Sequence, residues 1–549
     1  MSNRRKISLA LAGLMALSSL AACSSSSSST ASSSSTAAPA SSSSTAPASS
    51  VSSEPSGSEG PSRVTYPLSS TEKLVVYCNS MNPTGSITDV SEAWFHNKLA
   101  ERTGVNVEWQ FPVSGSNADQ NLNLMIASDE LPDVMIWNLG SRAQQLIEDG
   151  YLLPLNDVIA QWAPNLTDYL AEHPEFDKAL RTDSGDMYAF PFLRESEWLL
   201  TYKGPIARKD MLDAVGLDIP TTIDDWTVAL RAMKNEFGAY FTFNDSHTNI
   251  HGPWNAYGVI RDFYMEGDTI HYGPIEPQFK DALELMHGWY EEGLIDPDFT
   301  SLNDSTMKPK AVNDKVSMAY TVSSQFSSYV AGSAEVNPSA KWIGIPYPVL
   351  NEGDVQEFNH MSNMPEGKGA VITTQCKNVE LAARFLDYGY SEEGIMFYNF
   401  GEEGTTYTME NGVPTFTALI TEHPSGLTTG TNIYTGAGDG APTIQLINYW
   451  KSRNSAVAAE AVDIWNGGEK GNNMAVHRMP MLNPTTEENS EQSTLFNAID
   501  TYADEMYYKF IIGEESLDNF DQYVDTIKNM GIDRVLELKN TQYQRYLNR

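Results

Sequence analysis

The chain has 549 residues, with 71 Asp and Glu against 35 Lys and Arg, and its formal net charge is −36. Such a charge repels nucleic acids and anionic lipid headgroups, and it argues against an anionic ligand held by the general field of the protein. A chain of this length exceeds what one hydrophobic core usually supports, so two lobes are expected.

The first 22 residues have the pattern of a secretory signal peptide. Arg4-Arg5-Lys6 precedes an apolar run from Ile7 to Leu20, which is too short to remain as a membrane span. Small residues lead to Cys23, so we expect cleavage before Cys23 and attachment of a diacylglycerol to its thiol. This anchor would hold the protein on the extracytoplasmic face of the cell membrane. The alternative is an ordinary secreted protein with a chance cysteine.

Residues 23–65 are expected to form a disordered tether. Ser, Ala, Thr and Pro dominate this stretch, which lacks the apolar residues that a packed core requires. Fully extended, it would reach up to about 120 Å. That reach would lift a folded domain into a cell wall, which favours a Gram-positive bacterium.

Two further cysteines, Cys78 and Cys376, lie in apolar runs typical of strands. One disulfide between them is possible, but two buried thiols are favoured. No Cys-x-x-Cys pair indicates a metal site.

Strands and helices alternate along the first part of the chain, which is typical of an α/β lobe. The hydrophobic pattern predicts strands at 74–78, 105–109 and 133–137 and helices at 91–103 and 121–127, the first of them ended by Gly104.

The middle of the chain repeats this mixture, and the end is mainly helical. The pattern predicts helices at 207–215, 222–237, 277–293, 492–512, 517–530 and 532–546, and strands at 316–321, 342–346 and 369–374. Asn411-Gly412 lies between two strand-like runs and predicts a type I′ hairpin.

Short motifs occur in a fixed order across residues 72–549. They include Leu131-Pro132-Asp133-Val134, Gly185-Asp186-Met187-Tyr188-Ala189-Phe190-Pro191, Arg208-Lys209-Asp210-Met211-Leu212, Phe400-Gly401-Glu402-Glu403-Gly404 and Lys509-Phe510-Ile511-Ile512-Gly513. Together they resemble the family 1 extracellular solute-binding proteins of ABC importers, especially the large lipoprotein branch linked to oligosaccharide uptake.

The resemblance implies a two-lobed periplasmic-binding-protein-like α/β fold with a hinge and a largely helical C-terminal region. Projected onto this chain, lobe 1 holds residues 70–198 and 366–430, and lobe 2 holds 199–365 and 431–549. It also implies a monomer without cofactor that captures a carbohydrate by lobe closure and delivers it to an ABC permease.

A sugar site needs aromatic rings for the apolar ring faces and polar side chains for the hydroxyls. The residues that follow predicted strands or lie at the expected crossovers are Trp137, Asn138, Glu195, Trp198, Trp254, Phe326 and Asn363. Each could instead serve the core or the hinge.

Other functions are also compatible with the sequence. A peptide or amino-acid binder of the same fold would need a charged partner such as Arg194 or Arg261, and a sensor or adhesin would bind sugar without a permease. A surface glycosidase would need two facing carboxylates, for which Glu195 and Glu197 are a chance pair.

Asp245, His247 and His251 could reach a metal, but a solvated loop explains them better, so no metal and no catalytic residue is predicted. We find no Gly-x-Ser-x-Gly, His-Glu-x-x-His or phosphate-loop motif.

Overall fold

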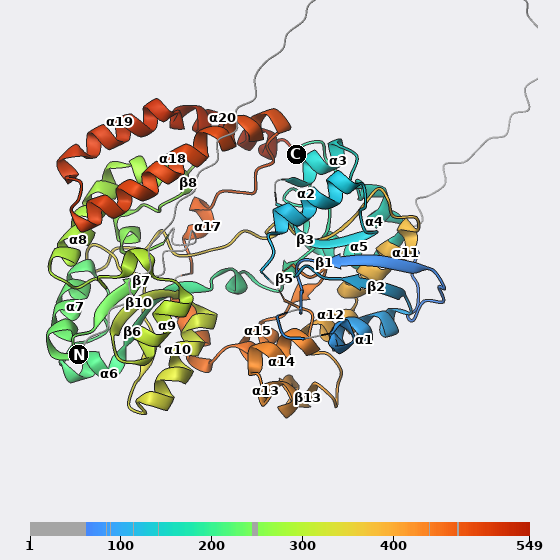
Figure 1. Cartoon of the computed structure of the whole chain (residues 1–549), viewed down its shortest axis with the longest axis horizontal. Helices are drawn as coiled ribbons and strands as arrows, with labels where there is room; N and C mark the ends of the chain where they lie inside the picture. Colours follow the sequence, from blue (N-terminus) through green and yellow to red (C-terminus); the bar gives the residue numbers. More distant parts are fainter. Residues whose placement is uncertain are drawn as a thin grey trace, which may run out of the picture. The chain divides into compact units, whose positions relative to one another are not determined.

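The computed structural model describes residues 62–549, apart from 84, 88, 114, 141, 244–250, 439 and 469–470. The predicted signal peptide, Cys23 and the tether up to residue 61 lie outside the described residues, as do Asp245 and His247. Within the described part, no helix is long and apolar enough to cross a membrane. The described chain forms two main sheets, each with its own hydrophobic core, and the fold is therefore two-lobed and mixed α/β (Figure 1).

The sheet of lobe 1 has the strand order β2-β1-β3-β12-β4. β1 runs parallel to β2 and β3, whereas β12 runs antiparallel to β3 and to β4. These strands are β1 (Lys73–Cys78), β2 (Asn106–Gln110), β3 (Val134–Asn138), β4 (Phe190–Pro191) and β12 (Lys368–Ile372). The parallel part therefore comes from the strand–helix alternation that the sequence predicts.

Helices cover both faces of this sheet. Along β1, Val76 packs into one core while Tyr77 packs into a second cluster, because successive side chains of a strand point to opposite faces. The helices of lobe 1 are α1 (Trp94–Thr103), α2 (Ala118–Ser128), α3 (Arg142–Glu148), α4 (Asn156–Trp162), α5 (Pro164–Glu172), α11 (Val379–Asp387), α12 (Glu392–Phe400), α13 (Ala418–Thr421), α14 (Leu427–Tyr434) and α15 (Ile447–Arg453).

The sheet of lobe 2 has the order β11-β6-β10-β7. Its strands are β6 (Lys203–Arg208), β7 (Tyr240–Phe243), β10 (Val316–Val322) and β11 (Trp342–Gly344). β6 is antiparallel to β10 and β11, and β10 is parallel to β7. The carboxyl ends of β7 and β10 therefore lie at the same edge, beside the start of β6.

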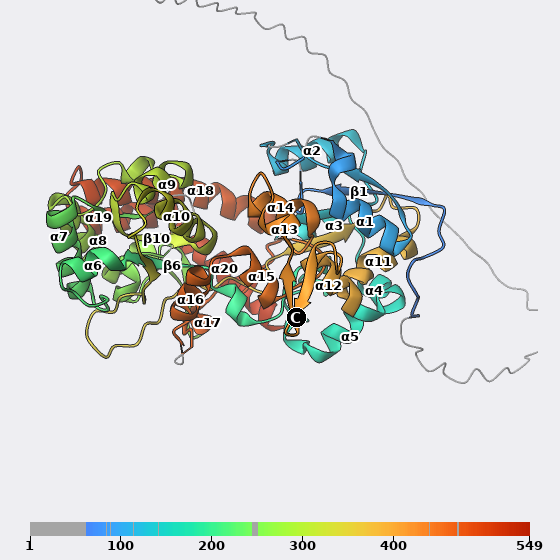
Figure 2. The same cartoon turned by 90° about the horizontal axis from the view of Figure 1, so that it is seen from below.

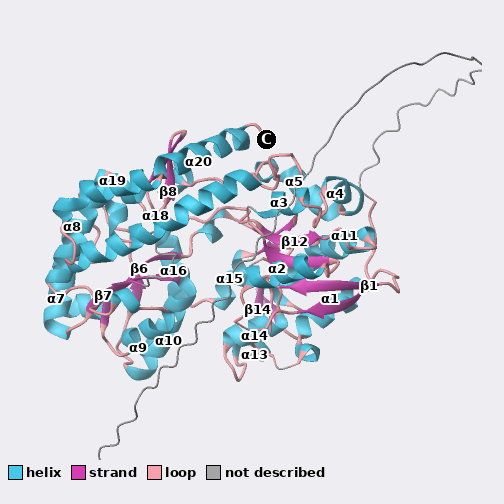
Figure 3. Cartoon of the chain, turned by 45° about the horizontal axis from the view of Figure 1, so that its top comes forward, coloured by secondary structure: helices cyan, strands magenta, loops and turns pink. Residues whose placement is uncertain are grey.

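Lobe 2 is rich in helices, and the C-terminal region adds five of them in its described residues (Figure 3). The helices are α6 (Lys209–Ala214), α7 (Ile223–Phe237), α8 (Pro277–Glu291), α9 (Asp304–Val312), α10 (Ser323–Val336), α16 (Ala456–Trp465), α17 (Met474–His477), α18 (Thr486–Ile512), α19 (Phe520–Met530) and α20 (Ile532–Leu547). A hairpin of β8 (Phe263–Glu266) and β9 (Thr269–Tyr272) completes the lobe.

Most predicted elements are confirmed, and two local details agree closely. The hairpin of β13 (Tyr407–Glu410) and β14 (Val413–Phe416) turns at Asn411 and Gly412, whose φ values are 53° and 83°. Cys78 and Cys376 are buried free thiols. The helix predicted from 207 begins later, at Lys209, because the preceding residues form β6. The sequence patterns did not predict β6, β7 or the β8–β9 hairpin.

The lobe boundary predicted at residue 430 is wrong. β15 (Ile444–Gln445) pairs in parallel with β5 (Leu193–Arg194), and Tyr449 packs in the lobe 1 core. Ala458 is the next buried residue that belongs to the lobe 2 core. The chain therefore changes lobe after α15, between the two bodies seen from below in Figure 2.

Candidate ligand-binding site

The chain first crosses between the lobes at residues 195–202, between β5 and β6. A pocket of about 610 Å³ lies where the two lobes meet this first crossing segment. This volume is within the range of about 300–1,000 Å³ that is common for small-molecule sites. Lobe 2 contributes the end of β10 and the first turns of α10, and lobe 1 contributes α14, β15 and α15. The lining residues are Arg194, Leu199, Tyr202, Val322, Ser323, Ser324, Ser327, Ser328, Leu427, Thr428, Thr431, Gln445, Tyr449, Trp450, Arg453 and Asn454.

The lining combines aromatic rings with neutral hydrogen-bonding groups. Tyr202, Tyr449 and Trp450 supply the rings, whereas serine and threonine hydroxyls from α10 and α14 and the amides of Gln445 and Asn454 supply donors and acceptors. None of the described lining residues is Asp or Glu. Such a lining suits a ligand whose rings have apolar faces and carry hydroxyl groups.

Tyr202 is held in place by a buried network around the first crossing segment. Its hydroxyl accepts a hydrogen bond from Ser362 Oγ at 3.1 Å, and the Arg194 guanidinium lies 5.6 Å from its ring centroid. Arg194 donates to the carbonyl of Leu199 at 2.9 Å and forms an ion pair with Glu366, also at 2.9 Å. Burial raises the pKa of Tyr202, so the phenol stays protonated and can donate or accept a hydrogen bond.

Glu195 and Trp198 connect the first crossing segment to α15 and α16, the helices on either side of the last crossing between the lobes. Glu195 Oε2 accepts a hydrogen bond from Ile447 N at 2.7 Å. Trp198 Nε1 donates to Asp463 Oδ1 at 2.7 Å, and its ring meets Trp450 edge-on with centroids 5.0 Å apart. Trp198 is the second residue of the short 3-10 helix η3 (Glu197–Leu200). These contacts fix Trp450 at the edge of the pocket, so both predicted residues lie beside the pocket rather than in its lining.

Trp137 and Asn138 form the end of β3 but do not belong to this pocket's lining. Trp137 is 3% exposed and stacks on Tyr77, with centroids 5.3 Å apart and ring planes at 21°. Asn138 is exposed at the same sheet edge. The ring of Trp137 therefore packs in lobe 1, whereas the side-chain amide of Asn138 is exposed.

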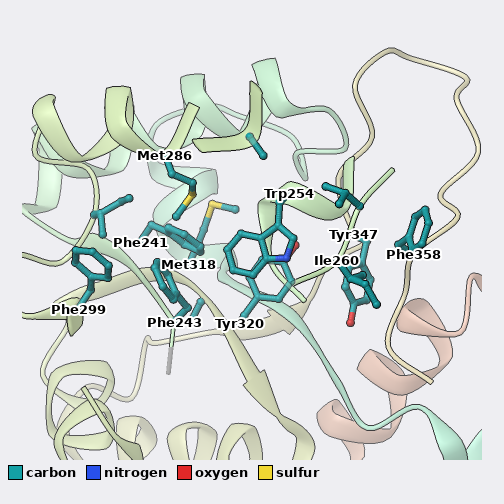
Figure 4. Close-up of a cluster of buried hydrophobic side chains, with 14 of the residues drawn as sticks. Phe241, Phe243, Trp254, Ile260, Met286, Phe299, Met318, Tyr320, Tyr347 and Phe358 are labelled. Atoms are coloured by element: carbon teal, nitrogen blue, oxygen red, sulfur yellow. The ribbon is translucent and has the colours of Figure 1, made fainter. Parts of the chain in front are cut away.

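Trp254 and Phe326 lie in the core of lobe 2, so the prediction that they contact ligand is wrong for this structure. Trp254 is 1% exposed and Phe326 is 0% exposed. Figure 4 shows Trp254 among Phe243, Tyr320 and other buried rings. Tyr507 of α18 meets the Trp254 ring edge-on at 5.9 Å, so the C-terminal helices cover the loop that the sequence places near the ligand.

Asn363 lines a separate, smaller pocket of about 300 Å³. This second pocket also involves Met364, Arg478, Tyr543 and Tyr546, so it lies beside the C-terminal helix α20. The structure therefore does not bring Asn363 together with Trp198 or with the lining of the larger pocket.

The sequence patterns missed most of the lining. Ser323 and Ser324 follow a predicted strand, which was a usable signal for the edge of lobe 2. Tyr449 and Trp450 lie on the short helix α15, and the misplaced lobe boundary hid their position at a crossing. No local pattern indicates Thr428 or Gln445, because their place depends on the pairing of β15 with β5.

The described residues contain no group of three or more His, Cys, Asp or Glu that could hold a metal ion. Of Asp245, His247 and His251, His251 alone is among the described residues, and Asn255 Nδ2 lies 3.0 Å from its Nδ1. Burial lowers the pKa of His251 to about 3.

Comparison with known proteins identifies the family. The model of the bacterial extracellular solute-binding proteins matches residues 84–396. The fructooligosaccharide ABC transporter substrate-binding protein FusA of Streptococcus pneumoniae is 25% identical over 62% of this chain, and the match spans 65% of that protein, slightly less than two thirds of its length. Lipoprotein LipO of Bacillus subtilis is 24% identical over 81% of this chain and 88% of its own length.

A solved structure supports the fold. An HMO-binding, ABC-transporter-associated solute-binding protein of Bifidobacterium longum infantis superposes with a TM-score of 0.73 at 17% identity, covering 86% of this chain and 99% of that one. The matched family model spans more than half of the sequence and includes the lobe 2 sheet and every strand of the lobe 1 sheet except β1. The chain therefore belongs to the bacterial extracellular solute-binding protein family.

Proposed function

We propose that this protein captures an oligosaccharide between its two lobes and delivers it to an ABC permease. The observation that carries this proposal is the pocket of about 610 Å³, whose hydroxyl, amide and aromatic lining comes from both lobes. The relative at 25% identity is named as a fructooligosaccharide-binding component of an ABC transporter, which supports the same ligand class.

The proposed mechanism is conformational. Ser323 and Ser324 belong to lobe 2, whereas Thr428 and Tyr449 belong to lobe 1. A ligand that contacts both sets stabilises the closed arrangement, and the permease recognises that shape. The energy for transport would come from a separate ATPase.

We further propose a monomer anchored through lipidated Cys23 on the extracytoplasmic face of the membrane, without catalytic activity. The similarity to lipoprotein LipO over 81% of the chain supports the anchor. Among the residues predicted from sequence, Asn138 and Trp198 remain candidates for ligand contact, because both reach the surface near a strand end or crossing. Glu195 and Asn363 remain candidates only for a ligand that extends beyond the larger pocket.

Thermal unfolding and isothermal titration with a panel of oligosaccharides, short peptides and divalent metals would test the proposal. A ligand at one hundred times its Kd adds about 2.7 kcal/mol to stability. We expect a shift with at least one oligosaccharide and no product on incubation. A shift with peptides alone, or cleavage of a sugar, would contradict the proposal.

Two matched variants locate the site. Trp450→Ala removes a half-buried ring from the pocket and should weaken binding by about 10-fold to 100-fold. Trp162→Ala removes a half-buried ring from α4, outside the pocket lining, and should leave affinity unchanged. Equal losses in both variants would place the ligand elsewhere.

A further inference from the structure

The charge of the pocket is opposite to that of the chain. The chain carries 71 Asp and Glu against 35 Lys and Arg. The described lining of the larger pocket nevertheless includes Arg194 and Arg453 and has no carboxylate. A local excess of positive charge can therefore act on a bound ligand inside a protein whose general field repels anions.

The two arginines differ in what they can offer a ligand. Arg194 is 8% exposed and already pairs with Glu366 at 2.9 Å. Arg453 is half-buried, and no carboxylate of the described residues forms an ion pair with it. Arg453 Nη1 donates a hydrogen bond to the hydroxyl of Tyr449 at 3.2 Å.

The Arg453 guanidinium is held by a fixed neighbour. Tyr449 is 1% exposed, and its hydroxyl lies 3.1 Å from Thr435 Oγ1 in a buried hydrogen bond. The guanidinium carbon lies 5.3 Å from the Tyr449 ring centroid. Tyr449 therefore orients one edge of the guanidinium, and the planar fork of an arginine is suited to binding a carboxylate through two parallel hydrogen bonds.

The backbone adds to this charge. α10 begins at Ser323 and α14 begins at Leu427, and both residues line the pocket. Neither helix has an acidic residue in its first turn. The partial positive charge of a helix N-terminus acts within about one turn, so the starts of both helices add to the positive charge at this pocket.

We propose that this pocket selects an oligosaccharide that carries a carboxylate, a uronate-type sugar, and that Arg453 is the residue that recognises the carboxylate. This inference rests on the proposed function. The neutral hydroxyls of α10 and α14 would bind the ring hydroxyls, Trp450 would contact a ring face, and Arg453 would bind the acid group. The general negative field is screened over about 8 Å at physiological ionic strength, so the nearby guanidinium dominates inside the pocket.

Isothermal titration of the full-length protein with trisaccharides from polygalacturonate and alginate, each compared with its carboxyl-reduced counterpart, tests this inference. The paired sugars differ in charge but keep the same ring stereochemistry at the hydroxyls. We expect an acidic trisaccharide to bind at least about 10-fold more tightly than its reduced partner. Reduced or other neutral sugars that bind as tightly as the acids would overturn the inference and leave the proposed function intact.

Three variants identify the responsible residue. Arg453→Gln should weaken binding of the acidic trisaccharide by about 10-fold to 100-fold, a larger loss than for its carboxyl-reduced counterpart. Arg453→Lys keeps the charge and should retain part of the affinity. Lys528→Gln removes an exposed cation from α19, outside the lining, and should change neither. If Arg453→Gln binds the acid as the wild type does while its thermal unfolding is unchanged, Arg453 does not recognise it. If no oligosaccharide of either kind binds and peptides do, the proposed function fails as well.

Discussion

Arg549 donates a hydrogen bond from Nε to Asp183 Oδ1 at 2.8 Å, and this contact ties the end of the chain to lobe 1. Arg545 of α20 donates to the other oxygen of Asp183 at 2.6 Å. The side chains of Arg549 and Asp183 are 1% and 8% exposed. Because α20 packs in the lobe 2 core, one buried carboxylate joins the C-terminal helix of one lobe to the other (Figure 1).

Asp183→Asn should destabilise the protein by about 3 kcal/mol, because it leaves a buried guanidinium facing a neutral amide. Urea unfolding monitored by fluorescence would measure this loss. Asp177→Asn is the control, since Asp177 forms an ion pair with Arg181 on the same segment but its side chain is 55% exposed. The control should cost less than about 1 kcal/mol. Equal effects of the two substitutions would show that the Asp183 contact is no stronger than a surface ion pair.

Trp254→Ala should destabilise lobe 2 by about 3–5 kcal/mol, because the ring is 1% exposed and packs against Phe243 and Tyr507. Trp254→Phe should cost less, since it keeps part of the buried volume. Calorimetry measures both losses, and titration at a temperature where the variants are folded measures affinity. A large loss of affinity with unchanged stability would return Trp254 to the ligand site.

The parallel part of lobe 1 could be predicted from sequence, whereas the lobe boundaries could not. β1 and β3 are continuous apolar runs, which give a strong local signal. β6 contains Gly204-Pro205, which is a turn signal by local rules, yet Pro205 lies inside the sheet opposite Tyr320. β15 has only two residues and carries no periodicity. Its pairing with β5 is a long-range contact that decides to which lobe the following helix belongs.

The sequence led us to expect aromatic and polar side chains at strand ends and crossings. None of the seven residues that it predicted lines the larger pocket. Individual aromatic residues failed because burial depends on what packs over them. The sequence predicts a loop around Trp254, but the residue lies in the 3-10 helix η4 (Pro253–Tyr257). Tyr507 of α18, more than two hundred residues away in the sequence, packs against its ring.

Glu366→Gln should destabilise the segment that crosses back to lobe 1 between β11 and β12. Glu366 pairs with both Arg194 and Lys368, and its side chain is 13% exposed. The substitution leaves two cations around a neutral amide, and we expect a loss of about 3 kcal/mol in unfolding free energy. Ligand affinity should fall too, because Arg194 packs against the Tyr202 ring that lines the pocket. Glu357→Gln, at a half-exposed position near His477, is the control. Unchanged stability in Glu366→Gln would contradict the prediction.

His96→Phe should flatten the pH dependence of stability between about pH 3 and 6.5. Burial lowers the pKa of His96 to about 3, and its ring packs edge-on against Trp109 and Phe111 at 4.9 and 5.0 Å. The unfolded chain binds a proton at this position below about pH 6.5, but the folded protein does not. The neutral ring therefore contributes stability above pH 6.5 that is lost as the pH falls, with a slope of about 1.4 kcal/mol per pH unit.

Asp387 gives the stability the opposite pH dependence, because burial raises its pKa to about 6. Its contribution to the free energy of unfolding is lost as the pH rises through that value. Comparison of His96→Phe with the wild type cancels this contribution and isolates the histidine. Unfolding free energies from urea titrations at pH 4, 5, 6 and 7 provide the measurement. At pH 7 the two proteins should differ by less than about 1.5 kcal/mol, since the substitution nearly conserves ring volume. Towards pH 4 the variant should become the more stable of the two, and parallel pH profiles would mean that the imidazole is protonated in the folded protein.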